Sequence, residues 1–369
     1  MYSVSEFLRN RIYQSAICLI CILLFSEFPQ RNRLAAQSAS SASIPASSTN
    51  RNITLDVVVT DKSGKPVPSL EQQDFTLLDN KQPQKILSFE ASQGVTGAGE
   101  PPIEVVLLVD EVNTAFSSVS YERQQIEKFL GHDSGELPRP TSLVFLRDSG
   151  TLMRNAPTRD ATALIADLNQ NEAGLRTIRR SQGVWGAGDR LQLSLRALQQ
   201  LADFESTKPG RKLVIWISPG WPLLSGPRID LSSKDQQRFF NDIVEFSDSL
   251  RRARITLYSI DPLGTADSGG LRTNYYEDFL KGVKNAKQVQ IGNLGLQVLA
   301  TQSGGRVLIS NNDVAGEIAA CVADANAFYS LTFEGLVGDG PNEYHSLEVK
   351  IDKPRLAART RSGYYAQPR

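Results

Sequence analysis

The predicted strand at residues 104–109 lies near the middle of the first half of the chain, and its apolar run, VVLLV, ends abruptly at Asp110. Its β-branched composition and lack of alternation predict a strand that is buried on both faces. A helical pattern follows, in which Ile126, Phe129 and Leu130 share one face. Because ligands of open parallel sheets bind just outside the carboxyl ends of the strands, Asp110 is the best-placed functional candidate. By position alone, a structural role for Asp110, as a helix cap or as a carboxylate that orders its loop, is expected as much as a functional one.

The same alternation of apolar strands and amphipathic helices continues to about residue 326. It predicts a doubly wound, mostly parallel, Rossmann-like α/β sheet with helices on both faces. The predicted strands are 142–147, 212–218, 254–260 and 306–309, with a short edge strand at 152–154. The predicted helices are 159–168, 189–204, 232–252, 275–283, 291–302 and 313–326, and residues 169–188 are polar and irregular.

Both flanks of this α/β region change to the period of two that is typical of β-strands. Three short strands are predicted within residues 52–90, and further strands within residues 327–333, 344–351 and 356–365. So few strands on each flank cannot close a good core alone. The economical interpretation is one small β-sandwich built from residues 51–95 and 327–369, with the α/β domain of residues 102–326 inserted. Two separate small β caps are the alternative.

The N-terminal residues predict export. Arg9 and Arg11 precede an apolar stretch, residues 12–25, that has the length of a signal-peptide core and is short for a membrane span. Small residues near position 36 offer a cleavage site, so residues 1–37 are expected to be a signal peptide of a secreted or periplasmic protein. An uncleaved anchor is the alternative, and it would be the only membrane contact. Residues 38–50 are rich in Ser and Ala and form a predicted flexible tether.

Composition narrows the classes of partner. The chain has 369 residues, which is more than one domain's usual length, and its formal net charge is zero. With a pI near 6.8, it gives no support for binding nucleic acid or anionic membranes.

Seven short stretches, taken in this order, resemble a von Willebrand factor A domain, and most of all the bacterial secreted subgroup labelled VWFA-related. They are VTDKSGKPV (59–67), DFTLLDNKQ (74–82), VLLVDEVNT (106–114), GRKLVIWIS (210–218), LYSIDPLG (257–264), LATQSGGRVL (299–308) and RSGYYA (361–366). The resemblance covers nearly all of the chain after the tether. It implies the same α/β fold and a role in binding proteins.

Many domains of this family hold Mg²⁺ with the pattern Asp-x-Ser-x-Ser, a Thr on a second loop and an Asp after the fourth strand. Hard oxygen ligands suit that ion and leave one position for a partner's carboxylate. Here Asp110 matches, Val112 stands at the first Ser position and Thr114 at the second, while Asp189 and Ser218 lie nearest the other two. The resemblance therefore implies an altered, weak site for Mg²⁺ or another divalent cation, made by Asp110, Thr114, Asp189 and Ser218. In the alternative, Asp110 orders its loop by accepting N–H bonds and no metal binds.

Catalytic motifs are missing from the sequence. His132 and His345 have no G-x-S-x-G or comparable nucleophile motif near them, and both are expected on the surface. Cys321 falls on the apolar stripe of a predicted helix and is expected to be a core thiol. We therefore expect a protein that is not an enzyme.

Two tryptophans are expected near Asp110 if the fold is as predicted. Trp185 lies in the irregular stretch GVWGAGD, and Trp221 follows the strand that ends at residue 218. Exposed aromatic side chains would suit a protein interface, which Asn113 would complete, although both could instead tuck under their own loops. We expect a protein-binding module of adhesion type. A metal-independent scaffold or assembly subunit is the alternative, followed by a hydrolytic enzyme.

Overall fold

The computed structural model describes residues 51–92, 103–132, 135–153, 156–171, 183–222, 231–263, 275–309 and 311–368. The predicted signal peptide and tether lie outside these residues. Within the described part of the chain, no helix has the length and apolar character that a membrane crossing requires.

A seven-stranded sheet forms the centre of the α/β region, in the order β11-β10-β9-β5-β6-β7, with β8 paired to β6. Strands β5, β6, β9, β10 and β11 are parallel, whereas β7 and β8 run antiparallel to β6. The mostly parallel α/β sheet predicted from the sequence is confirmed. The strands are β5 (Ile103–Asp110), β6 (Glu136–Arg147), β7 (Gly150–Met153), β8 (Thr158–Asp160), β9 (Arg211–Ile217), β10 (Ile255–Ile260) and β11 (Val307–Leu308).

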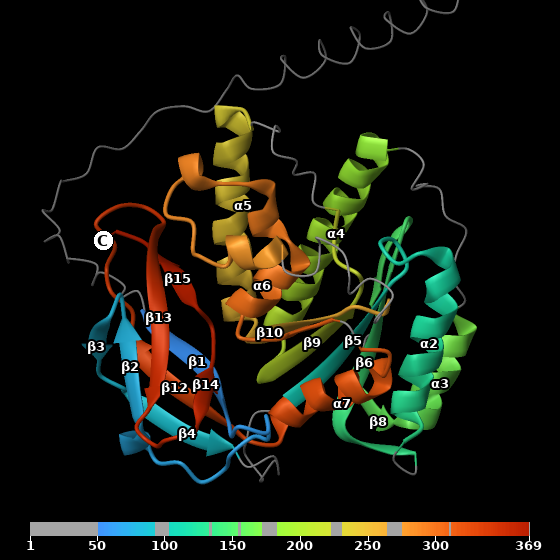
Figure 1. Cartoon of the computed structure of the whole chain (residues 1–369), viewed down its shortest axis with the longest axis horizontal. Helices are drawn as coiled ribbons and strands as arrows, with labels where there is room; N and C mark the ends of the chain where they lie inside the picture. Colours follow the sequence, from blue (N-terminus) through green and yellow to red (C-terminus); the bar gives the residue numbers. More distant parts are fainter. Residues whose placement is uncertain are drawn as a thin grey trace, which may run out of the picture. The chain divides into compact units, whose positions relative to one another are not determined.

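Strand β5 is buried at every residue, and its successive side chains enter two different cores. Val105, Leu107 and Val109 pack with helices α2, α3 and α7, while Val106 and Leu108 pack with α4, α5 and α6. Figure 1 shows these two groups of helices on opposite faces of the sheet. Each such aliphatic side chain contributes about 1.5–3 kcal/mol by leaving water. The helices are α2 (Phe116–Leu130), α3 (Ala161–Gln170), α4 (Gly183–Ser206), α5 (Ser233–Arg252), α6 (Leu296–Gln302) and α7 (Val314–Val322).

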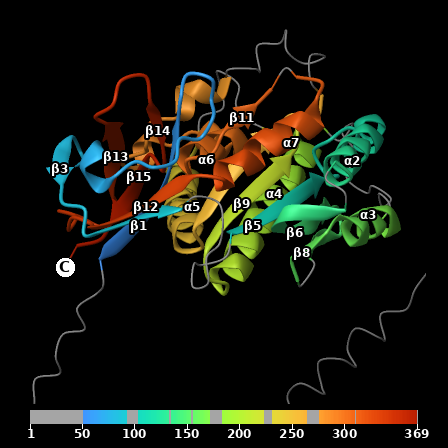
Figure 2. The same ribbon diagram turned by 90° about the horizontal axis from the view of Figure 1, so that it is seen from below.

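Two four-stranded antiparallel sheets combine strands from both flanks of the chain; we call them together the β unit. One has the order β14-β1-β12-β4 and the other β15-β13-β2-β3. Figure 2 shows β1 beside β12, and β4 pairs with the other edge of β12. Side chains of both sheets, among them Leu55, Leu77 and Phe333, share one apolar core. The strands are β1 (Asn52–Thr60), β2 (Phe75–Asp79), β3 (Gln82–Gln84), β4 (Ser88–Ser92), β12 (Phe328–Glu334), β13 (Glu343–Ile351), β14 (Ala357–Arg359) and β15 (Gly363–Ala366).

Several predicted elements have different bounds. The last of the three strands predicted within residues 52–90, at residues 85–90, begins later than predicted, because β3 ends at Gln84 and β4 begins at Ser88. The single strand predicted at 356–365 is wrong, because β14 and β15 are two separate strands there. The predicted helix 275–283 is only a 3-10 turn, Tyr275–Phe279. The predicted helix 291–302 is interrupted at Gly295, whose extended backbone separates the 3-10 turn Ile291–Leu294 from α6. Finally, α4 begins at Gly183, inside the stretch predicted to be irregular.

The β unit contributes side chains to both cores of the α/β region and is joined to it by an ion pair. Val58 of β1 and Phe328 of β12 belong to one core of the α/β sheet, and Tyr365 of β15 to the other. In addition, the Arg254 guanidinium, just before β10, donates to the Asp56 carboxylate of β1 and to the Ser330 hydroxyl, the latter at 3.0 Å. The two parts are therefore expected to unfold together.

This coupling can be tested because all three tryptophans, at positions 185, 216 and 221, lie in the α/β region. Leu55→Ala removes a side chain from the β-unit core that is only 1% exposed. We expect a loss of about 2–5 kcal/mol, seen as a lower urea midpoint of tryptophan fluorescence. Glu348→Ala on β13, whose side chain is 57% exposed, is the control and should leave the midpoint in place. A Leu55→Ala protein with an unchanged fluorescence midpoint would mean that the two parts unfold independently.

Candidate functional site

The carboxylate of Asp110, at the carboxyl end of β5, is completely buried. One oxygen, Oδ1, accepts the backbone N–H groups of Val112 at 3.0 Å and Asn113 at 2.8 Å. The other, Oδ2, accepts the side-chain amide of Asn113 at 2.8 Å and the indole Nε1–H of Trp216 at 2.9 Å. Each oxygen thus has two N–H donors, which is as many as its lone pairs can take.

The donors come from different elements and join them. Trp216 lies on β9, next to β5, and its ring meets that of Trp221 edge-on at a centroid distance of 5.1 Å. The Asn113 amide also donates to the Ser194 hydroxyl of α4 at 2.9 Å. Asp110 is therefore the common acceptor that connects its own loop directly to β9 and, through Asn113, to α4.

A second carboxyl group, that of Glu122 on α2, lies near Asp110 and is also completely buried. The pKa of Glu122 is raised well above its ordinary value, mainly by burial and next by the negative charge of Asp110. Both effects favour the protonated, neutral form of the Glu122 side chain.

The four predicted metal ligands do not fit a divalent cation. Asp110 and Thr114 are buried in one loop, and the buried Ser218 hydroxyl accepts the Gly220 N–H at 3.2 Å. Asp189 instead lies exposed on α4. A cation at Asp110 would have to displace N–H groups whose hydrogens point at both carboxylate oxygens. Among the residues that the structure describes, no group of three or more His, Cys, Asp or Glu side chains could hold a metal ion.

The two predicted interface tryptophans differ in exposure. Trp185 is 85% exposed in the first turn of α4, whereas Trp221 is 4% exposed and packs against Trp216. Asn113, the third predicted interface residue, is buried at 3% exposure. Sequence reasoning missed Phe116, the first residue of α2, which is 68% exposed. A signal was available, because the apolar stripe of α2 extends one turn beyond its buried part.

Topology puts Phe116 and Trp185 at the same end of the sheet. Helix α2 follows β5 directly, so it begins where β5 ends. Helix α4 leads into the parallel strand β9, so it also begins at the carboxyl end of the strands (Figure 1). We call this end, with Phe116 and Trp185, the aromatic face.

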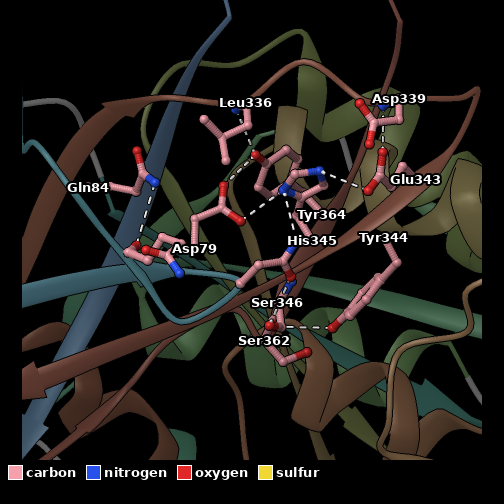
Figure 3. A network of polar contacts seen from close by, with 12 residues as sticks. Asp79, Gln84, Leu336, Asp339, Glu343, Tyr344, His345, Ser346, Ser362 and Tyr364 are labelled. Atoms are coloured by element: carbon pink, nitrogen blue, oxygen red, sulfur yellow. Dashed lines mark hydrogen bonds and ion pairs between the residues drawn. The ribbon is translucent and has the colours of Figure 1, made fainter.

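A buried histidine belongs to a separate polar network in the β unit, shown in Figure 3. The expectation that His345 lies on the surface is wrong, because it is 4% exposed and its Nδ1 lies 2.9 Å from an Asp79 oxygen. The other Asp79 oxygen accepts the Tyr364 hydroxyl at 2.6 Å. These contacts join β2, β13 and β15. Within the described residues, no hydroxyl or thiol hydrogen-bonds to His345. His132 is exposed and Cys321 buried, as expected.

Comparisons with known proteins show a distant likeness to solved structures only. No family model matches the chain, and no curated protein matches it. It is similar to proximal thread matrix protein 1 from the mussel byssus, with a TM-score of 0.34 and 10% identity over 70% of this chain and 48% of that one, so it spans about half that protein's length. The chain is also similar to the manganese-loaded TRAP protein of Plasmodium vivax, with a TM-score of 0.35 and 10% identity over 74% of this chain and 96% of that one. For a von Willebrand factor type A protein from Catenulispora acidiphila, the TM-score is 0.32 and the identity 10%, over 81% of this chain and 76% of that one.

The structural neighbours include von Willebrand factor A domain proteins. At this level of similarity, the neighbours say nothing about what this chain binds.

The Trp216–Asp110 hydrogen bond can be measured with a matched pair of substitutions. Trp216→Phe and Trp221→Phe each remove an indole from the same core, but only Trp216 donates to a carboxylate, and the buried Trp221 Nε1 has no partner among the described residues. We expect Trp216→Phe to cost about 1.5–3 kcal/mol more of the free energy of unfolding, measured in urea by far-UV circular dichroism. Equal losses in the two variants would show that the bond is unimportant.

Glu122 should make stability depend on pH. In the unfolded chain its pKa is near 4.5, and in the folded protein it is raised, so the folded state holds the extra proton. The stabilisation that this proton gives the folded protein is fully present below the pKa that Glu122 has in the unfolded chain. It is lost as pH rises toward the pKa of Glu122 in the folded protein. Glu122→Gln stays neutral, and its free energy of unfolding relative to wild type should rise between pH 5 and pH 8 by on the order of 1 kcal/mol. Parallel pH profiles of the two proteins would refute a protonated Glu122.

Proposed function

We propose that this chain is a metal-independent protein-binding module of adhesion type, and that it meets its partner through the aromatic face. We further propose that it is secreted or periplasmic, and that residues 51–95 and 327–369 form a small β-sandwich that carries the α/β domain. The sequence pattern of residues 1–37 supports export. A contribution from both flanks to each four-stranded sheet supports the sandwich.

The observation that carries the proposal is the contrast between a rigid loop and an exposed aromatic rim. The Asp110 carboxylate is fully engaged by N–H donors and therefore fixes the loop at the carboxyl end of β5. Phe116 follows that loop, and Trp185 belongs to α4, which Ser194 connects to the same loop. A preorganised support reduces the entropy that binding costs, and aromatic side chains dominate the energy of many protein interfaces.

This mode of binding differs from the one that the family's metal pattern implies. There, an ion would be shared with a carboxylate of the partner. Here, the partner would contribute apolar or cationic groups that cover the two aromatic rings, and chelators would have no effect on binding.

The proposal predicts which residues determine binding. A random peptide library is selected in EDTA on the chain lacking residues 1–37, and the dissociation constant of an enriched peptide is measured by fluorescence anisotropy. Trp185→Ala and Phe116→Ala should each weaken binding at least about 5-fold, which corresponds to roughly 1 kcal/mol. Leu87→Ala, which removes a 50% exposed apolar side chain from the β unit, should bind as wild type does.

Two results would count against this function. One is selection of peptides that bind only when Mg²⁺ or Mn²⁺ is added, which would restore the metal-dependent mode. The other is an affinity that Leu87→Ala lowers while Trp185→Ala and Phe116→Ala do not, which would move the contact to the β unit and favour the scaffold interpretation.

A further inference from the structure

A small polar cavity lies at the joint between the β unit and the α/β region. Its volume is about 20 Å³, and Asp56 and Arg361 of the β unit line it together with Arg251 and Arg254 of the α/β region. A cavity of this size accommodates about one particle as large as a water molecule or a small ion. The joint therefore contains room for one small ligand, beside one carboxylate and three guanidinium groups.

The charges around this cavity do not balance. Arg254 pairs with Asp56, and Arg251 pairs with Asp248 at 3.2 Å. Arg361 is 8% exposed, and its hydrogen bond in this joint is to the Ser247 carbonyl at 3.2 Å. No carboxylate in the described part of the chain forms an ion pair with it. Three guanidinium groups thus meet two carboxylates.

Arg361 remains charged although its surroundings disfavour the charge. Burial, and next the neighbouring Arg251, lower the pKa of Arg361 to about 10, while Asp248 and Asp56 act in the opposite direction. A pKa of about 10 still leaves the group protonated at neutral pH. The carboxyl end of α5, near Ser247, supplies only about half an elementary charge. An unpaired buried charge is costly, so a negative partner in the adjoining cavity would be strongly favoured.

One buried N–H group of the lining side chains has no acceptor in the described part of the chain. The buried Nε of Arg251 has no hydrogen-bond partner among the described residues. The nearby hydroxyl groups are already engaged, since Thr360 donates to the Asp56 carbonyl at 2.9 Å and Ser303 to the Ala300 carbonyl at 2.9 Å. The available donors are therefore guanidinium N–H groups, which prefer anions to water.

We propose that this cavity binds one small monovalent inorganic anion, of the size of chloride, between Arg251 of α5 and Arg361, which lies between β14 and β15. The volume excludes phosphate and organic carboxylates. Because the two arginines belong to different parts of the molecule, the anion fastens the β unit to the α/β region beside the Arg254–Asp56 pair. The site lies apart from the aromatic face and does not depend on the function proposed for that face.

The test is thermal unfolding of the full chain in sodium gluconate, with chloride replacing gluconate at constant ionic strength. Gluconate is too large for the cavity. Chloride should raise the melting temperature by roughly 2–4 °C and the rise should saturate, because a ligand of the native state stabilises it by mass action. A wild-type protein that melts at the same temperature in both salts overturns the proposal.

Substitutions assign the effect to this cavity. Arg361→Met keeps much of the side-chain volume and removes the charge, so the chloride-dependent rise should disappear. Arg238→Met, an exposed position on α5 with 58% side-chain exposure, should keep the full rise. An equal rise in Arg361→Met and wild type overturns the proposal.

If Arg361→Met does not fold, crystals of the wild-type protein grown in bromide give an independent answer. An anomalous bromide peak within hydrogen-bond distance of both Arg251 and Arg361 supports the site. Bromide peaks elsewhere only, with none in this cavity, overturn it.

Discussion

The buried carboxylate of Asp110 is the interaction on which the candidate site depends. An ionised carboxylate without water costs several kcal/mol, and the protein offsets this cost with N–H donors on both oxygens. These donors come from the loop itself, from Trp216 of β9 and from Asn113, whose amide also meets Ser194 of α4. This one carboxylate therefore connects the loop after β5 to β9 and α4. Burial, and next the charge of Asp110, raise the pKa of the neighbouring Glu122 and so disfavour a second negative charge there.

This arrangement changes what an acid at the end of the central strand can do. In a metal site, a carboxylate in this position turns lone pairs toward a cation and its hydration water. Here the lone pairs are used inside the protein, and Trp185 and Phe116 are large exposed apolar side chains at this end of the sheet. The β unit contributes rigidity of another kind, because its strands complete both cores of the α/β sheet and its charges meet those of α5 and β10 at the joint.

Much of the fold could be predicted from the sequence, because it is encoded locally. The apolar run of β5, the helical stripe of α5 and the period-two pattern of β1 and β13 each need only neighbouring residues to be recognised. The Trp216–Asp110 bond could not be found this way. It depends on the register that sets Leu108 beside Trp216, which makes Trp216 the diagonal neighbour of Asp110. The burial of His345 likewise depends on Asp79, which is 266 positions away in the sequence.

We infer that Asp110 is a structural anion and not a metal ligand. Thermal unfolding of wild type and Asp110→Ala in EDTA, Mg²⁺, Mn²⁺ and Ca²⁺ tests it most directly. We expect that no ion changes the wild-type melting temperature specifically. Asp110→Ala should lower that temperature to the same extent in every solution, because Trp216 and Asn113 lose their acceptor. A rise in melting temperature with one of these ions that is present in wild type and absent in Asp110→Ala would contradict it.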